Sequence, residues 1–166
     1  MKKSIYLIAT IAICLFLCVG CKKEDSASSV KATGKTVLKY LPGKWKVMYR
    51  IDEKGNKSTF EGNMILEFGK QESETDFGSN HGSSLWGYCH SYDADNPLVI
   101  FEGTWNIEPD SKDKGVLFYI EGDASIPFRS LNLFKSLYSC YITQISDSSM
   151  RIENSDDESG IILSRL

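Results

Sequence analysis

The stretch LPGKWKVMYRI, residues 41–51, decides the fold of this 166-residue chain. From Lys44 to Ile51 a large apolar or aromatic side chain stands at every second position, and the positions between carry mostly basic side chains. This period of two is that of a β-strand with one buried face. The Pro-Gly pair at 42–43 ends the preceding segment, residues 37–41, which we expect to form a helical turn that closes onto the domain.

Strand-like segments recur along the rest of the chain, separated by short turns rich in Asp, Asn, Ser and Gly. The expected strands are residues 44–51, 64–68, 84–92, 98–107, 115–121, 138–145, 150–154 and 160–166, with a short exposed strand around 75–77. Residues 122–136 fit a loop or a short helix around 131–137. About eight strands without a long helix predict an antiparallel all-β domain, an up-and-down barrel or alternatively a β-sandwich.

The N-terminus has the pattern of a secretory leader. Two lysines precede an apolar run over residues 5–19, which is shorter than the roughly 20 residues of a membrane-spanning helix. Gly20 then supplies the small residue of a cleavage site, and Cys21 supplies a thiol that can accept a lipid. We therefore expect residues 1–20 to be a signal peptide. An ordinary signal peptide with an incidental cysteine is the alternative.

Two short motifs refine this expectation. The stretch CVGC, residues 18–21, resembles a bacterial lipoprotein lipobox and implies lipidation at Cys21, although Cys18 stands where that family usually carries leucine. The stretch KED, residues 23–25, resembles the export signal of Bacteroidetes surface lipoproteins, with a solvated charged linker as the alternative. Together the motifs predict a protein held by acyl chains in the bacterial outer membrane and displayed at the cell surface.

Composition predicts one domain on a tether. Residues 21–36 read as the lipidated cysteine and a flexible, Ser-rich tether, and residues 37–166 are long enough for one domain with one core. Without residues 1–20, 17 basic and 22 acidic side chains give a net charge of −5. This acidic balance argues against nucleic acid and against docking on anionic lipid, so that membrane attachment would depend on the acyl chains.

Two cysteines, Cys89 and Cys140, lie in the expected domain. Outside the cytoplasm such a pair can oxidise to a disulfide, which would close a loop of about 52 residues and stabilise the fold by roughly 4 kcal/mol. Two separate buried thiols that pack as small apolar side chains are the alternative. The spacing of the two cysteines decides neither, and both remain open.

No pattern typical of a catalytic or metal site stands out. Cys89 and His90 are adjacent on an expected strand, so they point to opposite faces and cannot share a metal or form a Cys-His dyad. The acidic clusters lie in turns and lack the spacing of a calcium loop. We expect no cofactor, no metal site and no catalytic residues.

The segment 84–92 carries the best candidate for a binding site. Its alternate positions hold four ring-bearing side chains on one face, namely Trp86, Tyr88, His90 and Tyr92. Such rings could line the mouth of a barrel and stack on a sugar or an apolar ligand. A half-buried sheet face packed by loops is the alternative.

Three further motifs resemble the small lipocalin-like lipoproteins of Bacteroidetes. They are LPGKWK at 41–46, GTWNI at 103–107 and ITQISDSSMR at 142–151, and the ending LSRL at 163–166 also fits. The resemblance spans most of residues 38–166 but has no counterpart for residues 69–92. It implies an up-and-down, lipocalin-like barrel and no particular activity, because these domains mostly lack an assigned one.

The sequence thus predicts a lipid-anchored, non-catalytic envelope module that binds a small apolar or glycan ligand or a partner protein. One alternative is a structural subunit of an envelope assembly, which predicts a packed barrel with a large exposed apolar patch. The other is a hydrolase that uses residues 69–95, in which His81, Ser83 or Ser84 and an Asp would have to converge.

Overall fold

The computed structural model describes residues 30–76, 83–109, 114–130 and 140–166. The predicted signal peptide, the lipidation site Cys21 and the motif at 23–25 lie outside these residues, as does the predicted helical stretch at 131–137. In the described part of the chain, no helix is both long enough and apolar enough to cross a membrane.

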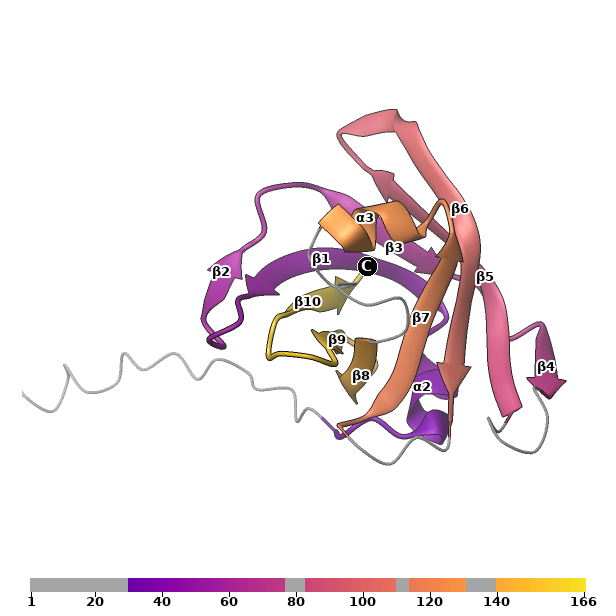
Figure 1. Ribbon diagram of the computed structural model, residues 1–166. Helices are drawn as coiled ribbons and strands as arrows, with labels where there is room; N and C mark the ends of the chain where they lie inside the picture. Colours follow the sequence, from indigo (N-terminus) through magenta and orange to yellow (C-terminus); the bar gives the residue numbers. More distant parts are fainter. Residues whose placement is uncertain (1–29, 77–82, 110–113, 131–139) are drawn as a thin grey trace, which may run out of the picture.

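Ten strands and two helices are described (Figure 1). They are α2 (Gly34–Tyr40), β1 (Gly43–Ile51), β2 (Lys57–Thr59), β3 (Met64–Phe68), β4 (Ser73–Asp76), β5 (Ser83–Asp93), β6 (Asn96–Glu108), β7 (Val116–Gly122), α3 (Ser125–Ser130), β8 (Cys140–Ile145), β9 (Ser149–Asn154) and β10 (Gly160–Arg165).

Eight of the strands close into an antiparallel barrel. Neighbouring strands follow the order β1, β3, β5, β6, β7, β8, β9, β10. Because β10 pairs with β1, the sheet closes on itself. Strand β2 pairs with the part of β1 beyond β3, and β4 pairs with the first half of β5. The prediction of an up-and-down, lipocalin-like barrel is confirmed, and the sandwich is not formed.

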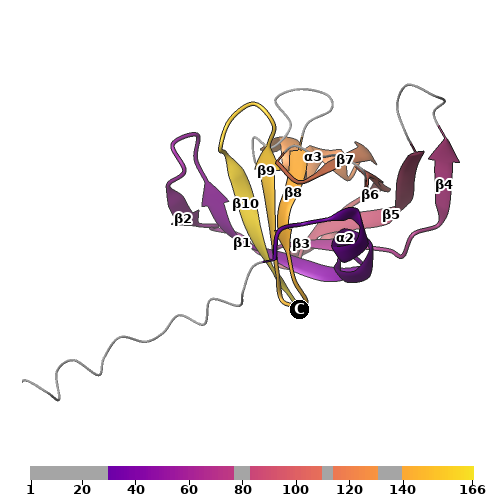
Figure 2. The same ribbon diagram turned by 90° about the horizontal axis from the view of Figure 1, so that it is seen from below.

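The chain enters the barrel through a short pairing and a helix that sits at one end (Figure 2). The backbone N–H of Ala32 donates to the carbonyl of Thr143 in β8, and Ala32 is buried in the core. Helix α2 then starts at a capping box formed by Thr33 and Thr36. Residues 30–33 are therefore in contact with the barrel, and the predicted helical closure before Pro42 is confirmed.

Aromatic side chains fill the inside of the barrel. The ring of Phe118 in β7 packs edge-on against Phe68 at 5.9 Å and contacts Phe128 of α3 at 6.2 Å between ring centroids. Helix α3 thus contributes a core side chain from the end of β7 opposite to α2. It lies within residues 122–136, for which the sequence left a loop and a short helix open.

The interior is packed wherever it can be examined residue by residue. Five of its large side chains expose no surface at all to a water-sized sphere: Trp45, Phe118, Phe128, Ile142 and Leu163. Because water does not reach these side chains, they fill the part of the interior that they occupy.

Arg165 stabilises the barrel where β10 pairs with β1. The guanidinium of Arg165, at the end of β10, lies 4.6 Å from the ring centroid of Trp45 and donates to the carbonyls of Pro42, at 3.0 Å, and Tyr40. The indole N–H of Trp45 in turn donates to the Leu41 carbonyl at 2.8 Å. These contacts join the last strand to the turn between α2 and β1.

Removing this guanidinium should weaken the whole barrel. We expect Arg165→Met to lower the free energy of unfolding by about 2–4 kcal/mol, because charged hydrogen bonds and a cation–π contact are lost and two carbonyls lose their donors. Chemical denaturation measures the change. The matched control is Arg50→Met, whose guanidinium lies 5.1 Å from the Phe60 ring on the surface and should cost under about 1 kcal/mol. Equal losses in both variants would contradict the role given to Arg165.

Candidate functional site

The predicted binding residues Trp86, Tyr88, His90 and Tyr92 lie on the outer wall of the barrel and not at its mouth. Strand β5 is paired on both sides, with β3 and β6, so its side chains alternate between interior and exterior. The alternate set, which includes Leu85, Cys89 and Ser91, is buried. The expectation of a ring-lined barrel mouth is therefore wrong, because the ring-bearing face turns away from the barrel interior.

The rings on this wall are partly exposed and polar groups flank them. Tyr88 is 54% exposed and meets Trp86 edge to face, with centroids 5.7 Å apart and planes at 86°. His90 Nδ1 lies 3.8 Å from a carboxylate oxygen of Glu102 on β6. Because adjacent rings stand perpendicular, the face offers no flat platform of parallel rings for stacking.

Strand β6 extends this apolar surface. Ile100 is the register partner of Tyr92, so both side chains lie on the same outer face, and Leu98 follows at the next outward position. Ile100 is 58% exposed and Leu98 is 92% exposed. We call the resulting surface the outer patch; it consists of Trp86, Tyr88, Tyr92, Leu98 and Ile100, and the polar pair His90–Glu102 lies within it between Tyr88 and Tyr92.

The outer patch runs along a hairpin that projects past its neighbour. Strand β7 pairs with β6 only from Gly103 onward, and the backbone N–H of Ala124 donates to the Glu102 carbonyl, so within the described residues the edge of β6 without a paired strand runs from Asn96 to Phe101. Figure 1 shows the β5–β6 hairpin reaching beyond the other strands at the end of the barrel away from α2. An exposed strand edge next to exposed aliphatic side chains is a typical docking surface for another chain.

Of the residues proposed for hydrolysis, Ser84 is described and its side chain is buried. His81 lies outside the described residues. The buried hydroxyl of Ser84 lies 3.3 Å from both the Ile107 carbonyl and the Tyr119 hydroxyl. His90 points outward from β5 toward Glu102. The described residues therefore hold no Ser-His contact.

The acidic clusters support turns. The Asp93 carboxylate accepts from the backbone N–H of Asp95, Asp95 accepts from the side chain of Asn63, and Asp157 accepts from the N–H of Ser159. Among the described residues, no three histidine, cysteine or carboxylate side chains come together as metal ligands.

Cys89 and Cys140 are separate buried thiols, so the disulfide alternative is not realised. They lie on β5 and β8, three strands apart along a wall with steps of about 4.8 Å. Their registers also differ, because Cys140 faces Phe118 and, across β6, the position of Leu85 rather than that of Cys89. A disulfide needs Cα atoms within about 7 Å, which this placement prevents.

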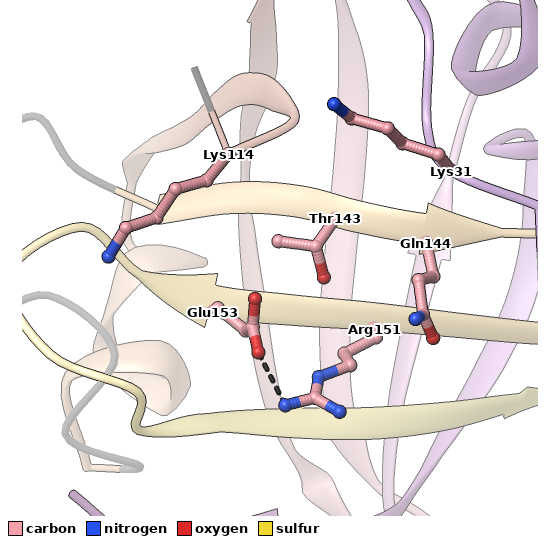
Figure 3. Close-up of a pocket in the computed structure, with 6 residues that line it drawn as sticks. All are labelled: Lys31, Lys114, Thr143, Gln144, Arg151 and Glu153. Carbon is pink, nitrogen blue, oxygen red and sulfur yellow. Dashed lines mark ion pairs between the residues drawn. The ribbon is translucent and has the colours of Figure 1, made fainter. Parts of the chain in front are cut away.

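A second surface, which the sequence did not predict, lies outside β8 and β9 (Figure 3). It is a solvent-open groove of about 460 Å³, and we call it the basic groove; its lining residues are Lys31, Lys114, Thr143, Gln144, Arg151 and Glu153. Arg151 pairs with Glu153 at 2.5 Å, and Lys114 donates to the Ser155 carbonyl at 3.0 Å.

Comparison with known proteins gives no relative: no protein-family model, no curated protein and no solved structure matches this chain.

The thiols should be inert in the folded protein. Burial raises the pKa of Cys89 to about 12 and also raises the pKa of Cys140, so at pH 8 only about one Cys89 in 10⁴ is a thiolate. We expect iodoacetamide to modify neither cysteine in the native state, and both in guanidinium chloride, as read by mass spectrometry of the chain from residue 22. A mass that rises when unreduced protein is treated with reductant would reveal a disulfide and contradict this assignment.

Proposed function

We propose that this protein is a lipid-anchored envelope protein whose barrel is a non-catalytic scaffold that presents its outer patch to a partner protein. The observation that supports this proposal most is the contrast between a packed interior and an exposed apolar exterior. Trp45 and Phe118 expose no surface inside the barrel, whereas Leu98 is 92% exposed on its wall. A scaffold that binds at its surface fits this distribution better than a container for a small ligand.

The membrane anchor rests on the sequence at the N-terminus. Cys21 follows an apolar run and Gly20, and the motifs at 18–21 and 23–25 resemble those of Bacteroidetes surface lipoproteins. Eight residues separate Cys21 from Val30, where the described fold begins, and the chain between the two spans at most about 32 Å. Acylation at Cys21 would thus hold the barrel close to the membrane and leave its wall free for a partner.

The composition of the outer patch favours a protein partner. Trp and Tyr are enriched at the centres of protein interfaces, and Leu98 and Ile100 add aliphatic surface on the same face. The edge of β6 next to Ile100 can donate and accept backbone hydrogen bonds with an extended segment of the partner. The perpendicular rings of Trp86 and Tyr88 are less suited to the flat face of a sugar.

Lipidation can be tested on the full chain in a bacterial host that processes lipoproteins. We expect wild-type protein to enter the detergent phase in Triton X-114 partitioning and Cys21→Ser to remain aqueous, because several acyl chains are needed for stable anchoring. Mass spectrometry of the N-terminal peptide should find the acyl groups on Cys21. Cys14→Ser, in the apolar run, is the matched control and should behave as wild type. Detergent partitioning of Cys21→Ser would refute the anchor.

The outer patch can be tested by photo-cross-linking in the bacterium that carries the protein. A benzophenone amino acid at Tyr88 should cross-link to one defined envelope protein, and the same group at Tyr49 on β1 should not. The double variant Leu98→Ser/Ile100→Ser should reduce the cross-link at least tenfold, yet change stability by under about 1 kcal/mol because both side chains are exposed. A cross-link that survives the double variant, or none at Tyr88, would rule out this surface.

A further inference from the structure

We propose that the basic groove outside β8 and β9 binds a tetrahedral oxyanion, the phosphate or sulfate group of a small ligand. The groove is formed by side chains of the N-terminal segment, the start of β7, and strands β8 and β9, and it is separate from the outer patch on β5 and β6. The inference does not depend on the membrane anchor or on a partner protein.

The hydroxyl of Thr143, which lines the groove, has no hydrogen-bond partner among the described residues. The pairing of β8 with β9 shifts register between Ile142 and Gln144, which leaves Thr143 as the extra residue of a bulge. Thr143 is 9% exposed, and its Oγ1 has no hydrogen-bond partner among the described residues. A buried hydroxyl without a partner costs free energy, and an anion in the groove would supply the missing acceptor.

Arg151 provides the second argument. Its Nη2 donates to Glu153 at 2.5 Å, which fixes the orientation of the guanidinium plane. Its Nε is buried and, within the described part of the chain, has no partner. Arg151 thus contributes a cation of fixed orientation to the lining of the groove, and guanidinium groups bind oxyanions through charge-assisted hydrogen bonds.

Local charge supplies the third argument. Figure 3 shows Lys31 and Lys114 on either side of Thr143, one from the N-terminal segment and one from the start of β7. With Arg151 they place three cations against the single carboxylate of Glu153, in a chain whose formal net charge is −3. No ion pair of Lys31 is found among the described residues, so its ammonium group is available to an anion.

Two sources can supply such a group. Lys31 follows Cys21 by ten residues, so an anchored barrel would bring the groove within reach of phosphate groups at the membrane surface. A soluble phosphate ester is the other source. The recognition chemistry is the same for both, and the experiment separates them.

The test uses the chain from residue 22 to 166, which contains the whole closed barrel, and records amide NMR shifts on titration with inorganic phosphate, sulfate and glycerol 3-phosphate. We expect saturable shifts confined to residues 30–32, β8, β9 and the start of β7. Arg151→Gln and Lys31→Gln should each weaken binding at least fivefold, and Thr143→Val at least threefold. Arg50→Gln, on β1 away from the groove, is the charge-matched control and should bind as wild type. Lys31→Gln keeps the test valid if Arg151→Gln is unstable, because Lys31 is exposed.

A second arm identifies the source. The same chain is mixed with phosphatidylcholine vesicles with and without phosphatidic acid, which presents a phosphomonoester, and bound protein is separated by flotation. Shifts with glycerol 3-phosphate and no flotation would assign a soluble ester, and flotation that Lys31→Gln removes would assign a lipid headgroup. An adventitious ion only, seen as weak shifts that are unchanged in Arg151→Gln and Lys31→Gln, would overturn the proposal, and so would the absence of any shift together with no flotation.

Discussion

The pairing of β10 with β1 is the constraint on which the rest of this structure depends. Until the last strand joins the first, the wall is an open sheet with two edges whose backbone groups lack partners. Trp45 and Arg165 are in contact where these two strands pair, and Arg165 also donates to the carbonyls of Pro42 and Tyr40. The same side chain therefore stabilises both the closure of the wall and the attachment of α2. Once the wall is closed, every side chain must lie either in a packed interior or on an exterior surface.

This division places the possible sites outside the barrel. The interior is occupied by large side chains such as Trp45, Phe118 and Phe128, which expose no surface. On the exterior, two of the described surfaces differ clearly in chemistry. The outer patch is apolar and aromatic, and the basic groove is cationic with a buried, unpartnered hydroxyl on Thr143. The cost of exposing Leu98 is understandable if a partner covers it.

The barrel could be predicted from sequence because alternation at residues 44–51 and in the closing strands reports directly on a wall with one buried face. The ring-bearing face of β5 could also be recognised, but not its direction, since both faces of that strand contain apolar residues. The space inside the barrel determines which face of β5 turns inward. A Cβ at Gly87 would lie 2.7 Å from the ring of Trp105, so only the face with the smaller side chains fits inside. The basic groove depends on a bulge at Thr143 and on the pairing of residues 30–32 with β8, and such long-range contacts leave no local pattern.

The two surfaces also differ in their position along the barrel. Residues 30–32 pair with the end of β8 near α2, so the basic groove lies where the chain enters the barrel. Helix α2 packs against Pro109, at the end of β6. Leu98 lies about ten residues before that end, or roughly 30 Å away along the strand. Figure 1 shows this hairpin at the opposite end of the molecule from α2. With Cys21 acylated as proposed, the chain would enter the barrel beside the basic groove, and the outer patch would lie at the opposite end. A ligand in the groove and a partner on the outer patch would then not block one another, because the two surfaces are far apart along the barrel.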